Sequence, residues 1–274
     1  MTDDPETDAV PEGPEDDRAM PLVAHLVELR RRLILSALGF AVAFGLCYWV
    51  SLDIYDILMR PLAKVMAEVG GTQRMIYTAL TEGFFTQVKV AAFGALFVSF
   101  PVVAAQIWMF VAPGLYRKEK RAFLPFLVAS PLLFLLGAAL VYFLVIPMAW
   151  KFLLGFQTTT AETALPIQLE ARVGEYLSLI MTLIFAFGVC FQLPVALTLL
   201  ARAGLIESRT LAKKRRYAVI AAFVVGAVLT PPDVVSQIAL ATPLILLYEL
   251  SIFACRRIEK ARAAEEAAEG DGAS

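Results

Sequence analysis

The sequence offers few residues for metal binding or enzymatic catalysis. Its one histidine is His25, and its three cysteines, Cys47, Cys190 and Cys255, each lie inside or at the edge of an apolar run. Zinc and haem sites draw several such ligands together, so we expect no metal and no cofactor. The motifs H-E-x-x-H, G-x-S-x-G and G-x-x-x-x-G-K-[ST] are also absent. We therefore predict a protein that is not an enzyme and has no catalytic residues.

Charged residues are scarce as well. They make up 18% of the 274 residues, whereas hydrophobic residues make up 59%, and the mean hydropathy is +0.71. A soluble domain has about 25% charged and about 45–50% apolar residues. Long uncharged stretches alternate here with short bursts of Lys and Arg, as in proteins whose helices cross a lipid bilayer. The composition predicts an all-α polytopic membrane protein, and we expect no nucleic-acid partner.

The two ends of the chain are polar. Residues 1–20 are rich in Asp, Glu and Pro, have nothing to bury, and are expected to form a disordered acidic segment. Residues 259–274 are first basic and then acidic and Ala-rich, which predicts a disordered charged tail or, alternatively, a fraying helix. Residues 21–258 remain as the membrane domain.

Six apolar segments predict six transmembrane helices. They cover residues 33–50, 84–111, 122–146, 176–203, 217–230 and 234–255. The second helix is longer than a crossing needs and carries Pro101, so it should tilt or kink, and Pro147 should end the third. The fifth segment would span only about 21 Å at 1.5 Å per residue, against a hydrocarbon core of about 30 Å. It forms either a re-entrant hairpin with the short sixth span or a short crossing that thins the bilayer, and the tight turn at Pro231-Pro232 favours the crossing.

Lys and Arg set the expected orientation. Most of the 24 basic residues lie before the first span, between the second and third, between the fourth and fifth, and after the sixth. The positive-inside rule therefore places both termini in the cytoplasm. The two long outer loops should carry interfacial amphipathic helices. We expect one over residues 54–66, broken near Pro61, and a second over Glu170–Leu177.

Two polar groups stand out near the cytoplasmic ends. His25, Glu28 and Arg32 share one helix face before the first span. Glu119 is an isolated carboxylate among four cations in the loop after the second span. The alternative for the first group is a basic cluster that only sets the orientation of the chain. The alternative for Glu119 is a surface glutamate that balances the neighbouring positive charges.

Other polar residues lie in or beside the predicted spans. Burying the amide of Gln192 in hydrocarbon costs free energy unless the amide is hydrogen-bonded. A polar residue at such a position more often joins neighbouring helices through hydrogen bonds than serves another function. Asp233 can cap the sixth helix, and Glu82 is a candidate helix-start carboxylate. These interpretations need no binding function.

Four groups of residues follow one another in a distinctive order. They are His25-Leu-x-Glu28-Leu-Arg30-x-Arg32-Leu, Phe110-x-x-Pro113-Gly-Leu115-Tyr116-x-x-Glu119, Phe191-Gln192-x-Pro194 and Leu229-Thr230-Pro231-Pro232-Asp233-x-x-Ser236-Gln237. This order resembles the TatC family, the integral membrane receptor subunit of the twin-arginine protein translocase. The resemblance covers roughly residues 20–258.

The resemblance implies a Sec-independent translocase subunit in the bacterial cytoplasmic (inner) membrane. It implies binding of the twin-arginine signal peptides of folded proteins, export driven by the proton-motive force, TatA- and TatB-type single-span partners, and a homo-oligomeric receptor complex. Glu28 and Glu119 would face the two arginines. The residues implied around them are Leu26, Leu29, Arg30, Phe110, Pro113 and Tyr116.

The resemblance also assigns an intramembrane polar group to partner docking. Its members are Gln192, Thr230, Asp233 and Gln237. The position of Gln192 is often Glu in the family; the amide here keeps a hydrogen-bonding group and removes a possible charge. The alternative function, a small-solute or ion secondary transporter, would require charged or broken helices at the bilayer midplane, and only Gln192 lies deep in a span.

Overall fold

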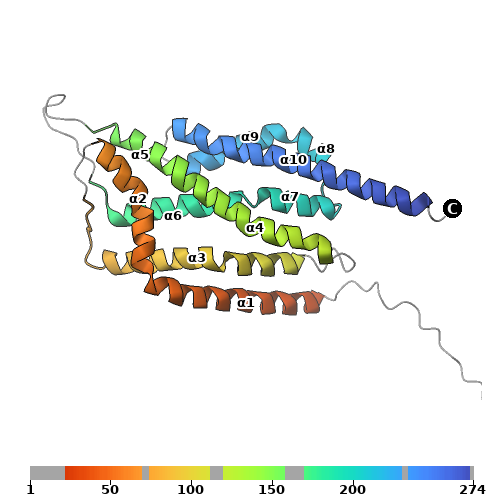
Figure 1. The fold of residues 1–274 in the computed structure, drawn as a ribbon, viewed down its shortest axis with the longest axis horizontal. Helices are drawn as coiled ribbons and strands as arrows, with labels where there is room; N and C mark the ends of the chain where they lie inside the picture. Colours follow the sequence, from red (N-terminus) through yellow and green to blue (C-terminus); the bar gives the residue numbers. More distant parts are fainter. Residues whose placement is uncertain (1–21, 70–73, 112–119, 158–169, 230–233, 272–274) are drawn as a thin grey trace, which may run out of the picture.

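The structure is a computed structural model that describes residues 22–69, 74–111, 120–157, 170–229 and 234–271. Within these ranges the regular structure is helical, apart from one isolated bridge between Ile76 and Arg172. The long helices lie side by side, and α2 turns away from α1 across one end of them (Figure 1). This arrangement matches the predicted all-α class.

The first helix, α1 (Leu22–Trp49), is longer than the span predicted from hydropathy. The basic segment before the span and the span itself form one helix. Helix α1 packs antiparallel along α3 (Glu82–Val111), and Gly39 lies so close to α3 that an added Cβ would be 3.3 Å from Val102 Cγ1. Pro101 lies inside α3 without ending it.

Helix α2 (Ser51–Val69) is continuous through Pro61, so the predicted break there is wrong. Proline lacks the N–H that would donate to the carbonyl four residues earlier, which is Ile57. The hydroxyl of Tyr142 donates to that carbonyl oxygen at 2.7 Å instead. Helix α2 buries an apolar face made of Leu58, Leu62, Val65 and Met66. Its location at the membrane surface stays a prediction.

The third predicted span is one helical run in three parts: α4 (Lys120–Leu140), the π-helical turn η2 (Val141–Val145) and α5 (Ile146–Leu154). The prediction that Pro147 ends this span is wrong. Pro147 lies in the first turn of α5, where a missing N–H costs little because the π turn has already shifted the hydrogen-bond register.

The fourth predicted span is divided into α6 (Val173–Cys190) and α7 (Leu193–Arg202), with the interruption at Phe191 and Gln192 just before Pro194. The separate helix expected over Glu170–Leu177 is not formed. Residues from Val173 onward are the first turns of α6, and Arg172 before them is extended.

The remaining helices are α8 (Ser208–Lys213), α9 (Arg215–Leu229) and α10 (Val234–Asp271). Residues 259–271 are helical, so the disordered tail expected there is wrong over that range, and the alternative of a helix holds. In the described part of the chain, five helical stretches are long and apolar enough to cross a membrane. They are His25–Trp49, Glu82–Phe110, Pro125–Leu154, Val173–Arg202 and Gln237–Ala264. The 15 residues of α9 are not among them, so a sixth crossing stays a prediction.

The main core gathers buried residues of α2, η2, α5 and α6. Helix α4 packs closely on α6. Phe134 and Phe187 are fully buried there. An added Cβ on Gly188 would lie 2.5 Å from the Phe134 ring, and one on Gly137 would lie 2.8 Å from Phe191. The two glycines therefore let the helices approach closely, as small residues do in membrane proteins.

Candidate functional site

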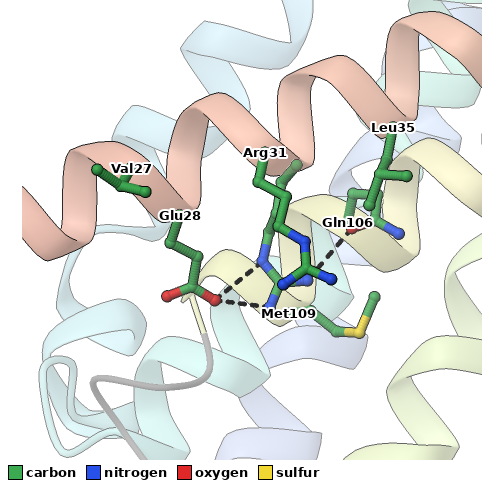
Figure 2. Close-up of a pocket in the computed structure, with 7 residues that line it drawn as sticks. Val27, Glu28, Arg31, Leu35, Gln106 and Met109 are labelled. Atoms are coloured by element: carbon green, nitrogen blue, oxygen red, sulfur yellow. Dashed lines mark hydrogen bonds and ion pairs between the residues drawn. The ribbon is translucent and has the colours of Figure 1, made fainter.

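A cavity of about 480 Å³ lies between the first half of α1 and the last turns of α3 (Figure 2). It combines apolar walls with charged groups. Its lining residues are Val27, Glu28, Arg31, Arg32 and Leu35 from α1 and Gln106 and Met109 from α3. The α1 residues recur every three or four positions, so one helix face forms that wall.

Glu28 and Arg32 form an ion pair inside this cavity. Arg32 donates from Nη2 to Glu28 Oε1 at 2.6 Å and from Nε to the same oxygen at 3.1 Å. The two side chains are 22% and 21% exposed, so solvent screens this pair less than a fully exposed one. Glu28 Oε2 has no hydrogen-bond donor among the described residues, and it remains an available acceptor.

The guanidinium of Arg32 also bridges the two helices. Its Nη1 donates to Gln106 Oε1 at 3.2 Å. One turn before Glu28 on α1 and one turn after Gln106 on α3, the rings of His25 and Phe110 stack on each other. Their centroids are 4.3 Å apart and their planes are inclined by 23°. Both contacts fix the start of α1 against the end of α3, so the cavity has defined walls.

Gln192 lies in a different place, at the break between α6 and α7. Its Nε2 donates to the Ser130 carbonyl at 2.9 Å, and its Oε1 accepts from the Ser130 hydroxyl. The indole of Trp108 donates to the same hydroxyl at 3.3 Å. The amide uses its donor and its acceptor at once, so this position joins α3, α4 and α7 and favours the packing interpretation.

Comparisons with known proteins agree with this architecture. The family model described as TatC, Sec-independent protein translocase protein, matches residues 24–243. The chain belongs to the TatC family. A TatC protein of Magnetococcus marinus is 49% identical over 92% of this chain and 90% of its own length. The TatC protein of Escherichia coli K12 is 42% identical over 90% of this chain and 92% of its own length.

Solved structures of the family have the same fold. A crystal structure described as the twin arginine translocase receptor TatC superimposes with a TM-score of 0.72 at 39% identity. The superposition covers 86% of this chain and 99% of the solved chain. As a TatC-family member with several helices able to cross a membrane, the chain is a multi-pass membrane protein and a component of protein transport, not an enzyme. The alternative of a solute or ion transporter is therefore rejected.

The structure brings together only some of the residues expected around the signal peptide. Glu28 lines the cavity, and the Phe110 ring stacks on the His25 ring beside it. Leu26 is 62% exposed and does not line the cavity, and neither Leu29 nor Arg30 lines it. The other three residues, Pro113, Tyr116 and Glu119, lie outside the described residues.

The partner-docking group is only partly described. Gln237 on α10 donates from Nε2 to the Phe223 carbonyl of α9 at 3.1 Å. Gln192 bonds within the bundle, as given above, and it shares no hydrogen bond with Gln237. Thr230 and Asp233 lie outside the described residues.

Several cavity residues were missed from the sequence of this TatC-family chain. Gln106 and Met109 sit within an apolar run, where nothing marks them as binding residues. The one signal in the sequence was their distance from Phe110. Gln106 lies four residues before Phe110 and therefore on the same helix face, and Met109 lies one residue before it. Arg31 was interpreted only as part of the orientation-setting basic cluster, although it lines the cavity.

Proposed function

We propose that this cavity receives an arginine of a twin-arginine signal peptide, with Glu28 as the acceptor. The observation that carries the proposal is the Glu28–Arg32 pair, in which the carboxylate already binds a guanidinium at a cavity wall. A guanidinium presents a planar fork of donors that the ammonium of lysine does not reproduce. The description of the solved relative as a twin arginine translocase receptor also supports the proposal.

Binding in this form is an exchange of one guanidinium for another. The peptide arginine first meets Glu28 Oε2 and then displaces Arg32 from Oε1. The number of ion pairs at the carboxylate stays constant, so little desolvation free energy is lost. Gln106 accepts from Arg32 at 3.2 Å and gives the displaced side chain a partner.

The second arginine is assigned to Glu119. This carboxylate lies in the chain between α3 and α4, directly before α4 begins at Lys120. Pro113 and Tyr116 belong to the same stretch. In this proposal the residues beside the cavity on α1 and α3 surround the bound signal peptide; they are Leu26, Leu29, Arg30 and Phe110.

The orientation of the chain in the bacterial inner membrane is part of the proposal. The start of α1, the end of α3 and the end of α10 lie at one end of the long helices (Figure 1). Exposed basic residues at that end support a cytoplasmic location for both termini. They include Arg30, Arg31, Lys213, Lys214, Arg216, Arg256 and Arg257.

The proposed partners are TatA- and TatB-type single-span proteins that dock along α9, near Gln192, Thr230, Asp233 and Gln237. One face of α9, made of Ile220, Val224 and Val228, is exposed in the chain alone and suits a partner helix in the bilayer. The complex further contains several copies of the chain and uses the proton-motive force. Residues 21–258 form its membrane domain, and residues 1–20 and 259–274 at its two ends lie in the cytoplasm.

A cross-linking experiment tests the binding site. A photo-reactive residue in place of Val27 or Leu35, both on the cavity wall, should capture a twin-arginine precursor and not its twin-lysine variant. Glu28→Gln should reduce capture by about tenfold, because a neutral amide accepts a guanidinium much less strongly.

The matched control is Asp56→Asn. Asp56 forms a similar i,i+4 pair with Arg60 at 2.8 Å on α2, away from the cavity. Equal capture of the twin-lysine precursor, or undiminished capture by Glu28→Gln, would reject the proposed site.

A further inference from the structure

The two chain segments that lead into α3 and α6 are joined side by side. Ile76 donates its N–H to the Ala171 carbonyl at 3.2 Å, and Val173 donates its N–H to the Ile76 carbonyl at 3.2 Å. These bonds join segments that are more than 90 residues apart in sequence. They lie at the end of α3 opposite the cavity.

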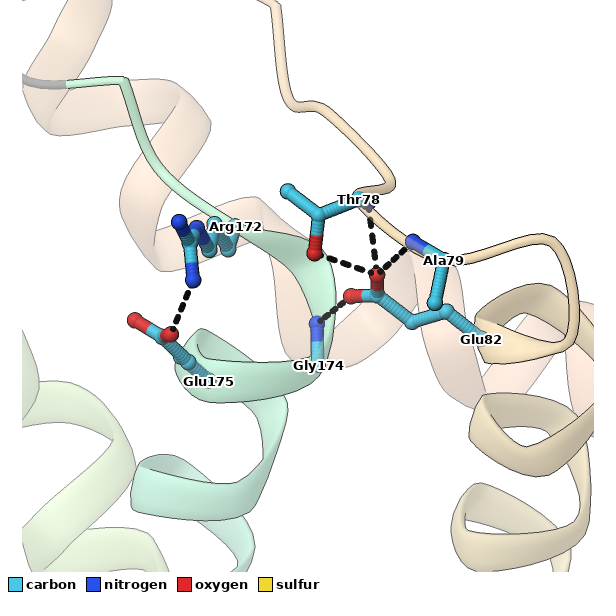
Figure 3. A network of polar contacts seen from close by, with 6 residues as sticks. All are labelled: Thr78, Ala79, Glu82, Arg172, Gly174 and Glu175. Atoms are coloured by element: carbon cyan, nitrogen blue, oxygen red, sulfur yellow. Dashed lines mark hydrogen bonds and ion pairs between the residues drawn. The ribbon is translucent and has the colours of Figure 1, made fainter.

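The carboxylate of Glu82 extends this junction to both helix ends (Figure 3). Its Oε2 accepts from the Thr78 N–H at 2.7 Å, the Thr78 hydroxyl at 3.3 Å and the Ala79 N–H at 3.3 Å. Its Oε1 accepts from the Gly174 N–H at 3.0 Å. One side chain thus binds the segment before α3 with one oxygen and the start of α6 with the other.

Helix α6 needs this acceptor. The first N–H groups of a helix have no partner within the helix. The N-cap residue Arg172 makes no side-chain capping bond, so Glu82 supplies both an acceptor and a negative charge to this helix start.

Nearby charges are otherwise engaged. Arg172 donates to Glu175 at 3.1 Å, and Arg74 donates to Glu170 at 3.3 Å. Within the described residues, Glu82 has no salt-bridge partner, and its bonds come from backbone N–H groups and one hydroxyl. Glu82 therefore acts by accepting hydrogen bonds and not by pairing with a cation.

Gly174 lets the carboxylate approach. An added Cβ at this position would lie 2.9 Å from Glu82 Oε1, and the nearest atoms all belong to that side chain. A methyl group here would displace the end of a flexible side chain and leave the backbone in place. Gly83, beside Glu82 on α3, has nothing within 4 Å of an added Cβ.

We propose that Glu82 is a positioning residue that clasps the start of α3 to the start of α6 and thereby fixes residues 76–79 against residues 171–174. The proposal does not depend on signal-peptide binding. It predicts that the clasp opens when either the carboxylate or the space beside Gly174 is lost.

Hydrogen exchange on the full chain in lipid nanodiscs tests the clasp. Glu82→Gln and Gly174→Ala should each speed exchange of the amides of residues 76–79 and 173–174 by roughly tenfold, because each removes bonds to a charged acceptor. The controls are Glu175→Gln, which removes an exposed ion pair and a first-turn charge of α6 but none of the bonds to Glu82, and Gly83→Ala, which enters open space. Both should exchange like the parent chain.

The double variant separates a clasp from two independent losses of stability. Glu82→Gln combined with Gly174→Ala should exchange no faster than the faster single variant, because both changes break the same contact. Additive effects, unchanged exchange in Glu82→Gln, or equal acceleration in the two controls would overturn the proposal. Since Gly174→Ala displaces only a side-chain end, it remains informative if Glu82→Gln fails to fold.

Discussion

At the scale of single residues, the guanidinium of Arg32 occupies the place beside Glu28 that an arginine of the signal peptide would take in the proposed complex. The Arg32 guanidinium binds Glu28 from the same helix face, one turn away, and it is steadied by Gln106 across the cavity. An internal arginine of this kind shields the carboxylate from other cations. It also lowers the apparent affinity for a peptide, because the peptide must compete with it.

The competition predicts the effect of Arg32→Gln. A labelled twin-arginine peptide should bind the purified chain about two- to fivefold more tightly, since release of a partly exposed ion pair costs about 0.3–1 kcal/mol. Fluorescence anisotropy in detergent measures this affinity. Arg60→Gln, which breaks the equivalent pair on α2, should leave it unchanged. Weaker binding by Arg32→Gln, as for Glu28→Gln, would show that Arg32 assists binding.

At the scale of helices, prolines are accommodated by side chains from other elements. In α2 the carbonyl of Ile57 loses its helical donor to Pro61, and the Tyr142 hydroxyl of η2 replaces that donor at 2.7 Å. The neighbouring carbonyl of Leu58 accepts from the buried Tyr176 of α6 at 2.8 Å. Helix α2 is thus fastened to η2 and to α6 through two adjacent carbonyl groups, one of which has lost its helical donor to Pro61.

A double-mutant cycle tests this account of Pro61. Tyr142→Phe alone should lower the free energy of unfolding in mixed micelles by about 0.5–1.5 kcal/mol, because the Ile57 carbonyl loses its donor. In a Pro61→Ala background the same change should cost much less, because the alanine backbone supplies the N–H that proline lacks. Tyr48→Phe is the control, since Tyr48 is exposed and its hydroxyl makes no hydrogen bond with the described residues. Equal costs in both backgrounds would contradict the account.

The same contacts show what could be predicted from the sequence. Hydropathy predicted where the apolar helices lie, because a helix that can cross lipid is marked by a continuous run of apolar residues within a short stretch of sequence. The continuity of α2 was missed because its replacement donor, Tyr142, is 85 residues away from the acceptor. Likewise, Glu28 was visible as a carboxylate in a basic motif, whereas Gln106 became a site residue only through the packing of α1 on α3.

At the scale of the whole molecule, α3 connects the two features discussed above. The Glu82 clasp lies at its first residue, and the cavity residues Gln106 and Met109 lie near its last. A helix of 30 residues spans about 45 Å, so both features are held by one helix that is long enough to cross a bilayer. By contrast, α9 has 15 residues and reaches only about 22 Å.

The short α9 leads to a prediction about the bilayer. Four leucines inserted between Ile220 and Ala221 would bring α9 close to the full hydrocarbon thickness of about 30 Å. If a thinned bilayer beside α9 contributes to transport, this variant should bind twin-arginine precursors normally and export several-fold less cargo into the outer compartment. The control replaces the exposed residues Ile220, Val224 and Val228 by Leu without changing the length, which keeps the face apolar. Equal export by the insertion variant and this control would reject the thinning argument. Loss of export in both would instead assign the effect to the docking face of α9.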